Sequence, residues 1–90
     1  MFKTLEELIE IIRQRKASSN EGSYTNKLLS KKKLSVEKIK EEIAELIDAI
    51  EKNTNKIHES ADVLYHLMVL LEANDIKIED VMDELKKRQK

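Results

Sequence analysis

The chain has 90 residues, of which 40% are hydrophobic and 39% charged, with one glycine, no proline and no cysteine. Its formal net charge of −1 excludes the broad positive field of a non-specific nucleic-acid binder. The lack of cysteine excludes a disulfide framework and a thiolate metal site. A single domain of this size buries only about 60–65% of its unfolded surface, so we expect a second copy to complete its core.

Neither a signal peptide nor a membrane span is expected. Residues 1–10 contain three glutamates and no apolar run longer than two residues, and the apolar stretch over 63–71 is interrupted by His66. Such a stretch is too short to cross a bilayer. We therefore expect a cytoplasmic protein that binds neither a membrane nor nucleic acid.

The N-terminal third of the chain predicts a helix over about residues 5–16 and a short helical turn over 24–29. The apolar residues of the first helix recur at helical spacing: Leu5, Leu8, Ile9 and Ile12. Thr4 is its predicted N-cap, with Glu7 three residues later completing a capping box. Residues 18–23 contain the only glycine and are expected to form the loop between the two elements.

Two longer helices are predicted next, joined by a turn at residues 53–55. The first has Ser35 as its expected N-cap. Its apolar residues are spaced by three and four: Val36, Ile39, Ile43, Leu46, Ile47 and Ile50. The second, over about 57–73, has two apolar stripes: Ile57, Ala61, Leu64, Met68 and Leu71, and Val63, Leu67 and Leu70. Because a helix that is apolar on two sides must be covered on two sides, we expect it to contact both its own chain and a partner copy.

A last amphipathic helix is expected over residues 78–89, with Val81, Met82 and Leu85 facing inward. Strands are hard to place in a chain with this pattern. The elements together predict one all-α domain over residues 1–90. We expect a small bundle of four to five helices that is completed by homo-oligomerisation.

Four carboxylates fall in two rows, Glu42 and Glu45 on the first long helix and Glu59 and Asp62 on the second. At about 100° of rotation per residue, each row lies on the flank of an apolar stripe, whereas Glu41 lies further toward solvent. In an antiparallel hairpin the two rows would face each other, and Mg²⁺ or Mn²⁺ would relieve their repulsion. Carboxylates at this spacing are also common on ordinary solvated helix faces, so spacing alone leaves both interpretations open.

The rows and the blocks around them resemble a known family. The pattern Glu42-x-x-Glu45, thirteen residues, Glu59-x-x-Asp62 resembles the signature of the MazG-type all-α nucleotide pyrophosphohydrolases. Two further blocks are similar to those of the phosphoribosyl-ATP pyrophosphohydrolases of histidine biosynthesis: Ser23-Tyr24-Thr25 and Ala61-Asp62-x-Leu64-Tyr65-His66-Leu67. The resemblance covers nearly the whole chain. Lys40 and Ser60 depart from it, where the family often has small residues.

This resemblance implies cleavage of phosphoribosyl-ATP to phosphoribosyl-AMP and pyrophosphate by a Mg²⁺-dependent homodimer or larger homo-oligomer, with Mn²⁺ as a candidate substitute. It implies that the metal ligands are Glu42, Glu45, Glu59 and Asp62. Glu41 is predicted to orient or deprotonate the attacking water, with a solvated neighbour as the equal alternative. Lys38 is predicted to reach a phosphate, with an ordinary helical pair to Glu42 as the alternative.

Six further residues are predicted to contact the substrate: Arg15, Lys16, Ser23, Tyr24, Thr25 and His66. Arg15 and Lys16 also suit the negative end of their helix. His66 either supports the Asp62 carboxylate or is a buried, hydrogen-bonded core residue. Two rival functions are kept: a MazG-type house-cleaning enzyme acting on nucleoside triphosphates, and a non-catalytic helical dimerisation domain.

Overall fold

The computed structural model describes residues 1–18 and 23–89. This part of the chain contains five helices and no strand: α1 (Lys3–Ala17), α2 (Tyr24–Ser30), α3 (Lys32–Lys52), α4 (Lys56–Ala73) and α5 (Ile78–Arg88). The all-α prediction is confirmed, and each predicted helix is present. The loop expected over residues 18–23 lies outside the described residues except for its two ends.

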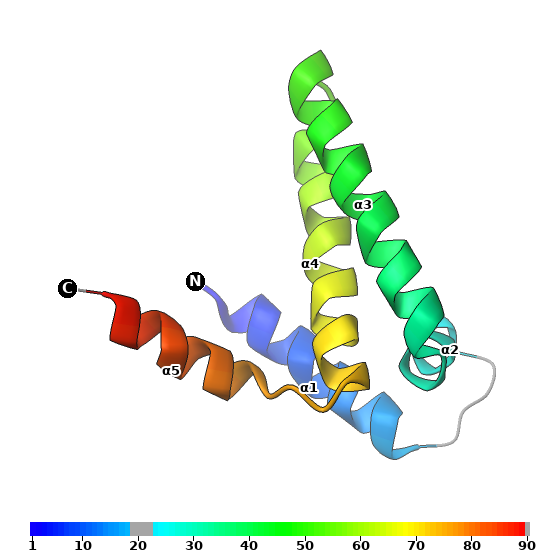
Figure 1. The fold of residues 1–90 in the computed structure, drawn as a ribbon, viewed down its shortest axis with the longest axis vertical. Helices are drawn as coiled ribbons and strands as arrows, with labels where there is room; N and C mark the ends of the chain where they lie inside the picture. Colours follow the sequence, from blue (N-terminus) through cyan, green and yellow to red (C-terminus); the bar gives the residue numbers. More distant parts are fainter. Residues whose placement is uncertain (19–22, 90) are drawn as a thin grey trace.

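The two longest helices, α3 and α4, form an antiparallel hairpin (Figure 1). The turn between them lies where the sequence predicts it. Asn53 and Asn55 adopt left-handed backbone conformations with φ of 54° and 49°. Asparagine tolerates this conformation better than most residues, so the chain reverses within three residues. The acidic middle of α3 therefore faces the N-terminal half of α4.

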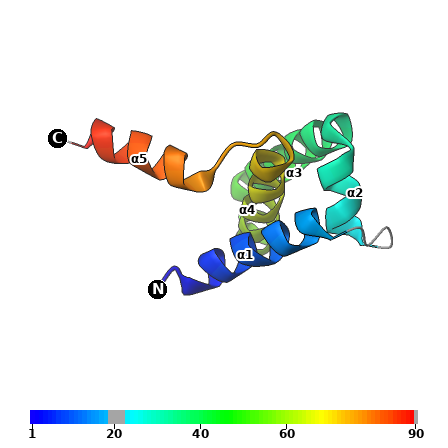
Figure 2. The same ribbon diagram turned by 90° about the horizontal axis from the view of Figure 1, so that it is seen from below.

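The buried core lies at the end of this hairpin that is remote from the turn. There α1 and α2 pack against α4 (Figures 1 and 2). The core cluster consists of Ile12, Leu28, Met68 and Val69. Fully burying a side chain of this kind contributes about 1.5–3 kcal/mol. Leu28 is the buried anchor of α2, so the core fixes this short helix beside α4.

The two predicted helix caps are wrong. Helix α1 begins at Lys3, two residues earlier than a Thr4 cap allows, and the Glu6 amide already donates to the Phe2 carbonyl at 3.2 Å. Helix α3 begins at Lys32, and the Ser35 amide donates to the Lys31 carbonyl at 3.1 Å. Both predicted caps are therefore inside a helix, and Ser35 is buried there with 1% exposure.

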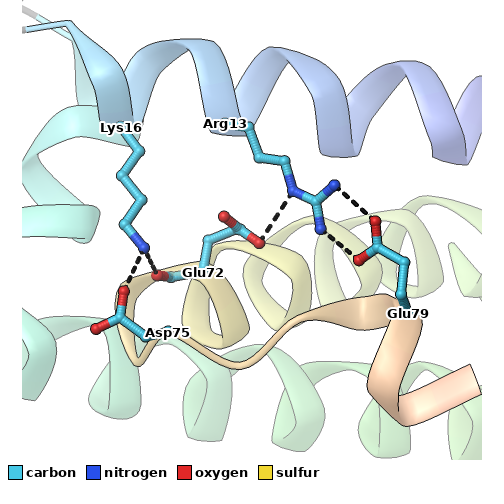
Figure 3. A network of polar contacts seen from close by, with 5 residues as sticks. All are labelled: Arg13, Lys16, Glu72, Asp75 and Glu79. Carbon is cyan, nitrogen blue, oxygen red and sulfur yellow. Dashed lines mark hydrogen bonds and ion pairs between the residues drawn. The ribbon is translucent and has the colours of Figure 1, made fainter.

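An ionic network joins α1 to the end of α4 and the start of α5 (Figure 3). Arg13 makes a bidentate contact with Glu79 at 2.6 and 2.9 Å and a further contact with Glu72 at 3.3 Å. Lys16 donates to the Asp75 carboxylate and to the Glu72 carbonyl, both at 2.6 Å. We call these five residues the clasp. It ties the turn after α4 to α1.

Beyond the clasp, α5 extends away from the other helices (Figures 1 and 2). The prediction that Val81, Met82 and Leu85 face a core is wrong for this chain alone. Val81 is half-buried, whereas Met82 and Leu85 are 49% and 46% exposed, and α5 has no fully buried residue. The clasp directs α5 outward, so its apolar face finds no cover within the described chain.

The α3–α4 hairpin also leaves apolar surface uncovered. The exposed side chains include Ile43, Ile47 and Ile50 on α3 and Ile57 and Leu64 on α4. The Cα radius of gyration is 14.2 Å, whereas a compact domain of this length has about 12 Å. The chain is thus open in shape. None of the described helices is long and apolar enough to cross a membrane.

Candidate active site

The α3–α4 hairpin brings the predicted acidic rows together. Carboxylate oxygens of Glu42, Glu45 and Glu59 all lie within 4.8 Å of one another. Asp62 lies one turn further along α4, where one of its oxygens falls within the same distance of ligand atoms of Glu59 and His58. Glu59 thus belongs to both groups. We call the four carboxylates, Glu42, Glu45, Glu59 and Asp62, the acid cluster.

Two oxygens of the acid cluster are buried without a hydrogen-bond partner: Glu42 Oε2 and Glu59 Oε2. Burial raises the pKa of the Glu42 carboxyl, and the negative charge of Glu45 raises it further. The same two causes, in the same order, raise the pKa of Glu59. A buried acceptor without a donor is costly. The cluster therefore favours uptake of a proton or a cation.

The donor set fits a hard divalent cation. All four side chains offer oxygen ligands, which Mg²⁺ and Mn²⁺ prefer, and the chain has no cysteine to offer sulfur. The unpartnered oxygens of Glu42 and Glu59 point to a missing positive partner. The acid cluster also borders a surface hollow of about 360 Å³ lined in part by Glu45 and Glu59. A cation held there would be open to a phosphate ligand.

His58 is a further neighbour of the site. Its ring is exposed, and its Nε2 lies 3.4 Å from Asp62 Oδ2. The two residues are four apart on α4, which places them on one face of the helix. That spacing was the signal available in the sequence.

An aromatic group links α2 to α4 beside the acid cluster. The Tyr24 hydroxyl lies 3.1 Å from His66 Nε2, and the Thr25 hydroxyl forms a short hydrogen bond with the Tyr65 hydroxyl. The Tyr24 and Tyr65 rings stack with centroids 6.5 Å apart. His66 is buried, and its Nδ1 lies 2.9 Å from the Asp62 backbone carbonyl. His66 is thus a buried, hydrogen-bonded residue, and its partners are the Tyr24 hydroxyl and the Asp62 main chain.

The start of α2 is tied to the end of α1. Ser23 is the N-cap of α2, and its hydroxyl accepts from the Asn26 amide at 3.4 Å. Arg15 donates to the same hydroxyl at 3.3 Å. Asn26, which the sequence interpretation did not single out, donates to the carbonyls of Arg15 and Ser18 at 2.6 and 3.0 Å. Arg15 and the predicted Ser23–Thr25 segment therefore lie together.

Lys38, Glu41 and Lys16 are outside the acid cluster and make contacts with other residues. Lys38 bonds to the Glu41 carboxylate at 3.2 Å, so its helical pair is with Glu41 instead of Glu42. This contact is the main cause that raises the pKa of Lys38. Glu41 is exposed. Lys16 belongs to the clasp, where its ammonium group is bonded to Asp75.

Comparison with known proteins decides the family. The chain matches the phosphoribosyl-ATP pyrophosphohydrolase family over residues 5–89. The chain belongs to this family. The ExxE…ExxD pattern of the sequence falls on the four residues of the acid cluster, so the family pattern and the folded site coincide.

Individual relatives in the phosphoribosyl-ATP pyrophosphohydrolase family agree with the match. The chain is 48% identical to the histidine biosynthesis bifunctional protein HisIE of Pyrococcus furiosus, over 96% of this chain and 41% of that protein. It is 45% identical to a phosphoribosyl-ATP pyrophosphatase of Clostridium novyi, over 96% of this chain and 81% of the relative. A phosphoribosyl-ATP pyrophosphatase of Methanococcoides burtonii is 41% identical, over 98% of this chain and 94% of the relative. The chain thus spans less than half of the bifunctional relative and most of the other two.

Proposed function

We propose that this chain hydrolyses phosphoribosyl-ATP to phosphoribosyl-AMP and pyrophosphate, the second step of histidine biosynthesis. The observation that carries the proposal is the convergence of the Glu42, Glu45 and Glu59 carboxylates, two of them with unpartnered buried oxygens. Family membership and the names of the relatives support the choice of substrate. The charged nucleotide substrate supports the cytoplasmic location expected from the sequence.

The reaction adds one water across a phosphoanhydride bond. A water oxygen bonds to phosphorus, the bridging P–O bond breaks with its electrons leaving on pyrophosphate, and the water releases a proton. When bound, Mg²⁺ supplies charge that offsets the phosphate oxygens and polarises the water. The residues proposed to hold it are Glu42, Glu45, Glu59 and Asp62. Their fixed placement on two helices of one hairpin supplies the preorganised geometry that such catalysis needs.

The reaction also needs a group that takes the proton released by the water and groups that bind the phosphates. Glu41, one residue before the acid cluster, is proposed to orient the water or to accept its proton. Lys38, bonded to Glu41, is proposed as a phosphate contact. Arg15, Ser23, Tyr24 and Thr25 lie together at the start of α2 and are proposed to contact the substrate. Lys16 stays a predicted phosphate contact, which would require it to leave Asp75.

We also propose that the working enzyme is a homodimer or larger assembly. The exposed apolar residues of α3, α4 and α5, including Ile47, Leu64 and Met82, would be covered by a second copy. The open shape of the single chain supports this proposal.

Product analysis tests the activity. Phosphoribosyl-ATP is incubated with the protein in Mg²⁺ and, in parallel, in EDTA, and phosphoribosyl-AMP and pyrophosphate are measured. We expect both products in Mg²⁺ and none in EDTA. Nucleoside triphosphates serve as competing substrates, and a higher kcat/KM for any of them would favour the house-cleaning function. No turnover together with no Mg²⁺-dependent rise in melting temperature would favour the non-catalytic dimerisation domain.

A further inference from the structure

His66 joins the helix that carries Asp62 to the helix that carries Tyr24. Its Nδ1 lies 2.9 Å from the Asp62 backbone carbonyl and its Nε2 3.1 Å from the Tyr24 hydroxyl. A carbonyl oxygen can only accept, so Nδ1 carries a proton. Burial raises the pKa of Tyr24 above its usual value, so the phenol stays protonated at neutral pH. In the neutral ring, Nε2 therefore accepts the Tyr24 hydrogen.

These two hydrogen bonds use both ring nitrogens of His66. The side chain is also buried, with 7% exposure, and its ring packs edge-on against Tyr65 with centroids 5.0 Å apart. No polar atom of His66 is left for a phosphate or a ribose. Any effect of His66 on the reaction should therefore act through its two partners, the Tyr24 hydroxyl and the Asp62 main chain.

Tyr24 is the first residue of α2, and the position of this helix depends on its contacts with the rest of the chain. Helix α2 has seven residues, and a helix this short is unstable alone in water. Its placement depends on the burial of Leu28 and on the bonds that tie Ser23 and Asn26 to the end of α1. It depends further on two side-chain bonds to α4, Tyr24 to His66 and Thr25 to Tyr65. Of these two α4 partners, His66 is the one that is also bonded to a residue of the acid cluster, through its Nδ1 and the Asp62 carbonyl.

We propose that His66 is a positioning residue: it holds Tyr24, and with it the segment Ser23–Thr25, at a fixed place relative to the acid cluster. The inference rests on the proposed function, because it assigns this segment to substrate contact. The main-chain carbonyl of Asp62 anchors the His66 ring, and the carboxylate of Asp62 belongs to the acid cluster. The substrate contacts on α2 therefore keep a fixed position relative to α4, which carries Glu59 and Asp62.

Two amide substitutions separate the two bonds of His66. The amide of glutamine reaches the position of the histidine Nε2, so His66→Gln keeps a partner for Tyr24 and gives up the Asp62 carbonyl. The amide of asparagine reaches the position of Nδ1, so His66→Asn keeps the carbonyl bond and gives up Tyr24. Tyr24→Phe removes the same hydroxyl bond from the other side and keeps the ring stacked on Tyr65.

The variants are compared by kcat and KM for phosphoribosyl-ATP, by Mg²⁺ affinity and by melting temperature. We expect Tyr24→Phe and His66→Asn to lower kcat/KM about 10- to 100-fold, as displacement of substrate contacts by about 1 Å does. His66→Gln should lose less than His66→Asn, since it keeps the Tyr24 partner and gives up only the bond that anchors the ring to the Asp62 main chain. Mg²⁺ affinity should be unchanged in all three, because no carboxylate is altered. Tyr24→Phe combined with His66→Asn should be no worse than either alone.

Equal losses for His66→Gln and His66→Asn would overturn the proposal, as would loss of Mg²⁺ affinity in step with activity. An NMR readout keeps the test independent of the assay. The ¹⁵N signal of His66 Nε2 should differ between the unchanged protein and Tyr24→Phe, whereas the Nδ1–H signal should be the same in both. If the unchanged protein does not hydrolyse phosphoribosyl-ATP, the proposed function fails. The His66–Tyr24 bond is then judged by this signal alone, and an unmoved Nε2 overturns it.

Discussion

At the scale of single residues, the acid cluster holds charges that the folded chain does not neutralise. Glu42 Oε2 and Glu59 Oε2 are buried without donors, and the carboxylate of Glu45 lies beside both. Among the described residues, Asp62 is the one of the four carboxylates with a basic side chain within ion-pair distance, His58. Such an arrangement is unfavourable without a cation. It is a feature of a binding site more than of a structural ion-pair network.

Replacing Glu59, one of the two carboxylates with an unpartnered buried oxygen, should separate function from stability. Glu59→Gln is expected to lower turnover at least ~100-fold, because the amide cannot supply the anionic oxygen that holds the metal. The same change should raise the melting temperature of the metal-free protein, since it removes repulsion from Glu45. Glu10→Gln, on the exposed face of α1, is the matched control and should alter neither quantity. Retained turnover, or unfolding of Glu59→Gln, would contradict the metal-site assignment.

The raised pKa values of Glu42 and Glu59 also predict a pH dependence of stability. Both groups bind protons more tightly in the folded state than in the unfolded state, where the pKa has its ordinary value of 4.5. Their contribution to stability is therefore full below that value and is lost as pH rises through the raised pKa. We expect these two groups to make the metal-free protein more stable as pH falls through their raised pKa values toward 4.5. The double variant Glu42→Gln, Glu59→Gln should lack this gain in stability when the melting temperature is measured against pH in EDTA. Equal slopes of melting temperature against pH in the double variant and the unchanged protein would refute the prediction.

At the scale of elements, the clasp determines where α5 points. Arg13 holds the pKa of Glu79 down to about 2, chiefly through their hydrogen bonds, and Lys16 lowers the pKa of Asp75 in the same way. Helix α5 has 11 residues and no buried side chain. A helix of this length is marginal in isolation. Its attachment therefore depends on the packing of Ile78 against the core cluster and on the exposed ion pair between Arg13 and Glu79.

Removal of one clasp partner should loosen α5 without disturbing the core. Glu79→Gln is expected to speed hydrogen exchange of α5 amides several-fold and to leave those around Val69 unchanged. Glu84→Gln is the matched control: it removes the pair with Arg88 inside α5, at 3.1 Å, and leaves the clasp intact. Acid should mimic the variant, because the contribution of Glu79 is present above pH 4.5 and is lost as pH falls toward about 2. Equal exchange in the two glutamine variants would show that the clasp does not hold α5.

At the scale of the whole molecule, the single chain is incomplete. Its core cluster is drawn from three helices, α1, α2 and α4, whereas α3 and α5 leave apolar faces open. The expectation that α4 is apolar on two sides holds in part. Leu67 and Met68 pack in the core of the same chain, and Ile57 and Leu64 are exposed. These faces are the surface that a second copy would cover.

Assembly should therefore depend on the exposed apolar residues of the hairpin. Ile47→Lys is expected to raise the dimer dissociation constant at least about tenfold, which corresponds to about 1.4 kcal/mol. Glu37→Lys places the same side chain on the polar face of α3 and should leave assembly unchanged. Analytical ultracentrifugation over a range of concentrations measures both. A stable, active monomer at micromolar concentration would defeat the proposal.

Much of the local structure follows from the sequence. The apolar spacing on α3 and α4 predicted both helices, and Asn53 to Asn55 predicted the turn that makes them antiparallel. The spacing of Glu42, Glu45 and Glu59 then predicted their convergence, because a hairpin brings the facing middles of two helices together. These features depend on residues close in the chain or on one tight turn. Local spacing is sufficient to set them.

Other features depend on contacts between residues far apart in the chain. Helical spacing predicted that α5 has an apolar face, but the outward direction of α5 comes from Arg13 and Glu79, 66 residues apart. In the same way, His66 was identified as a candidate, but its partners, the Tyr24 hydroxyl and the Asp62 main chain, come from the packing of α2 on α4. Periodicity along a sequence states which side of a helix is apolar. Which partner covers that side is decided by packing and charge between distant segments, and only the tertiary structure contains that information.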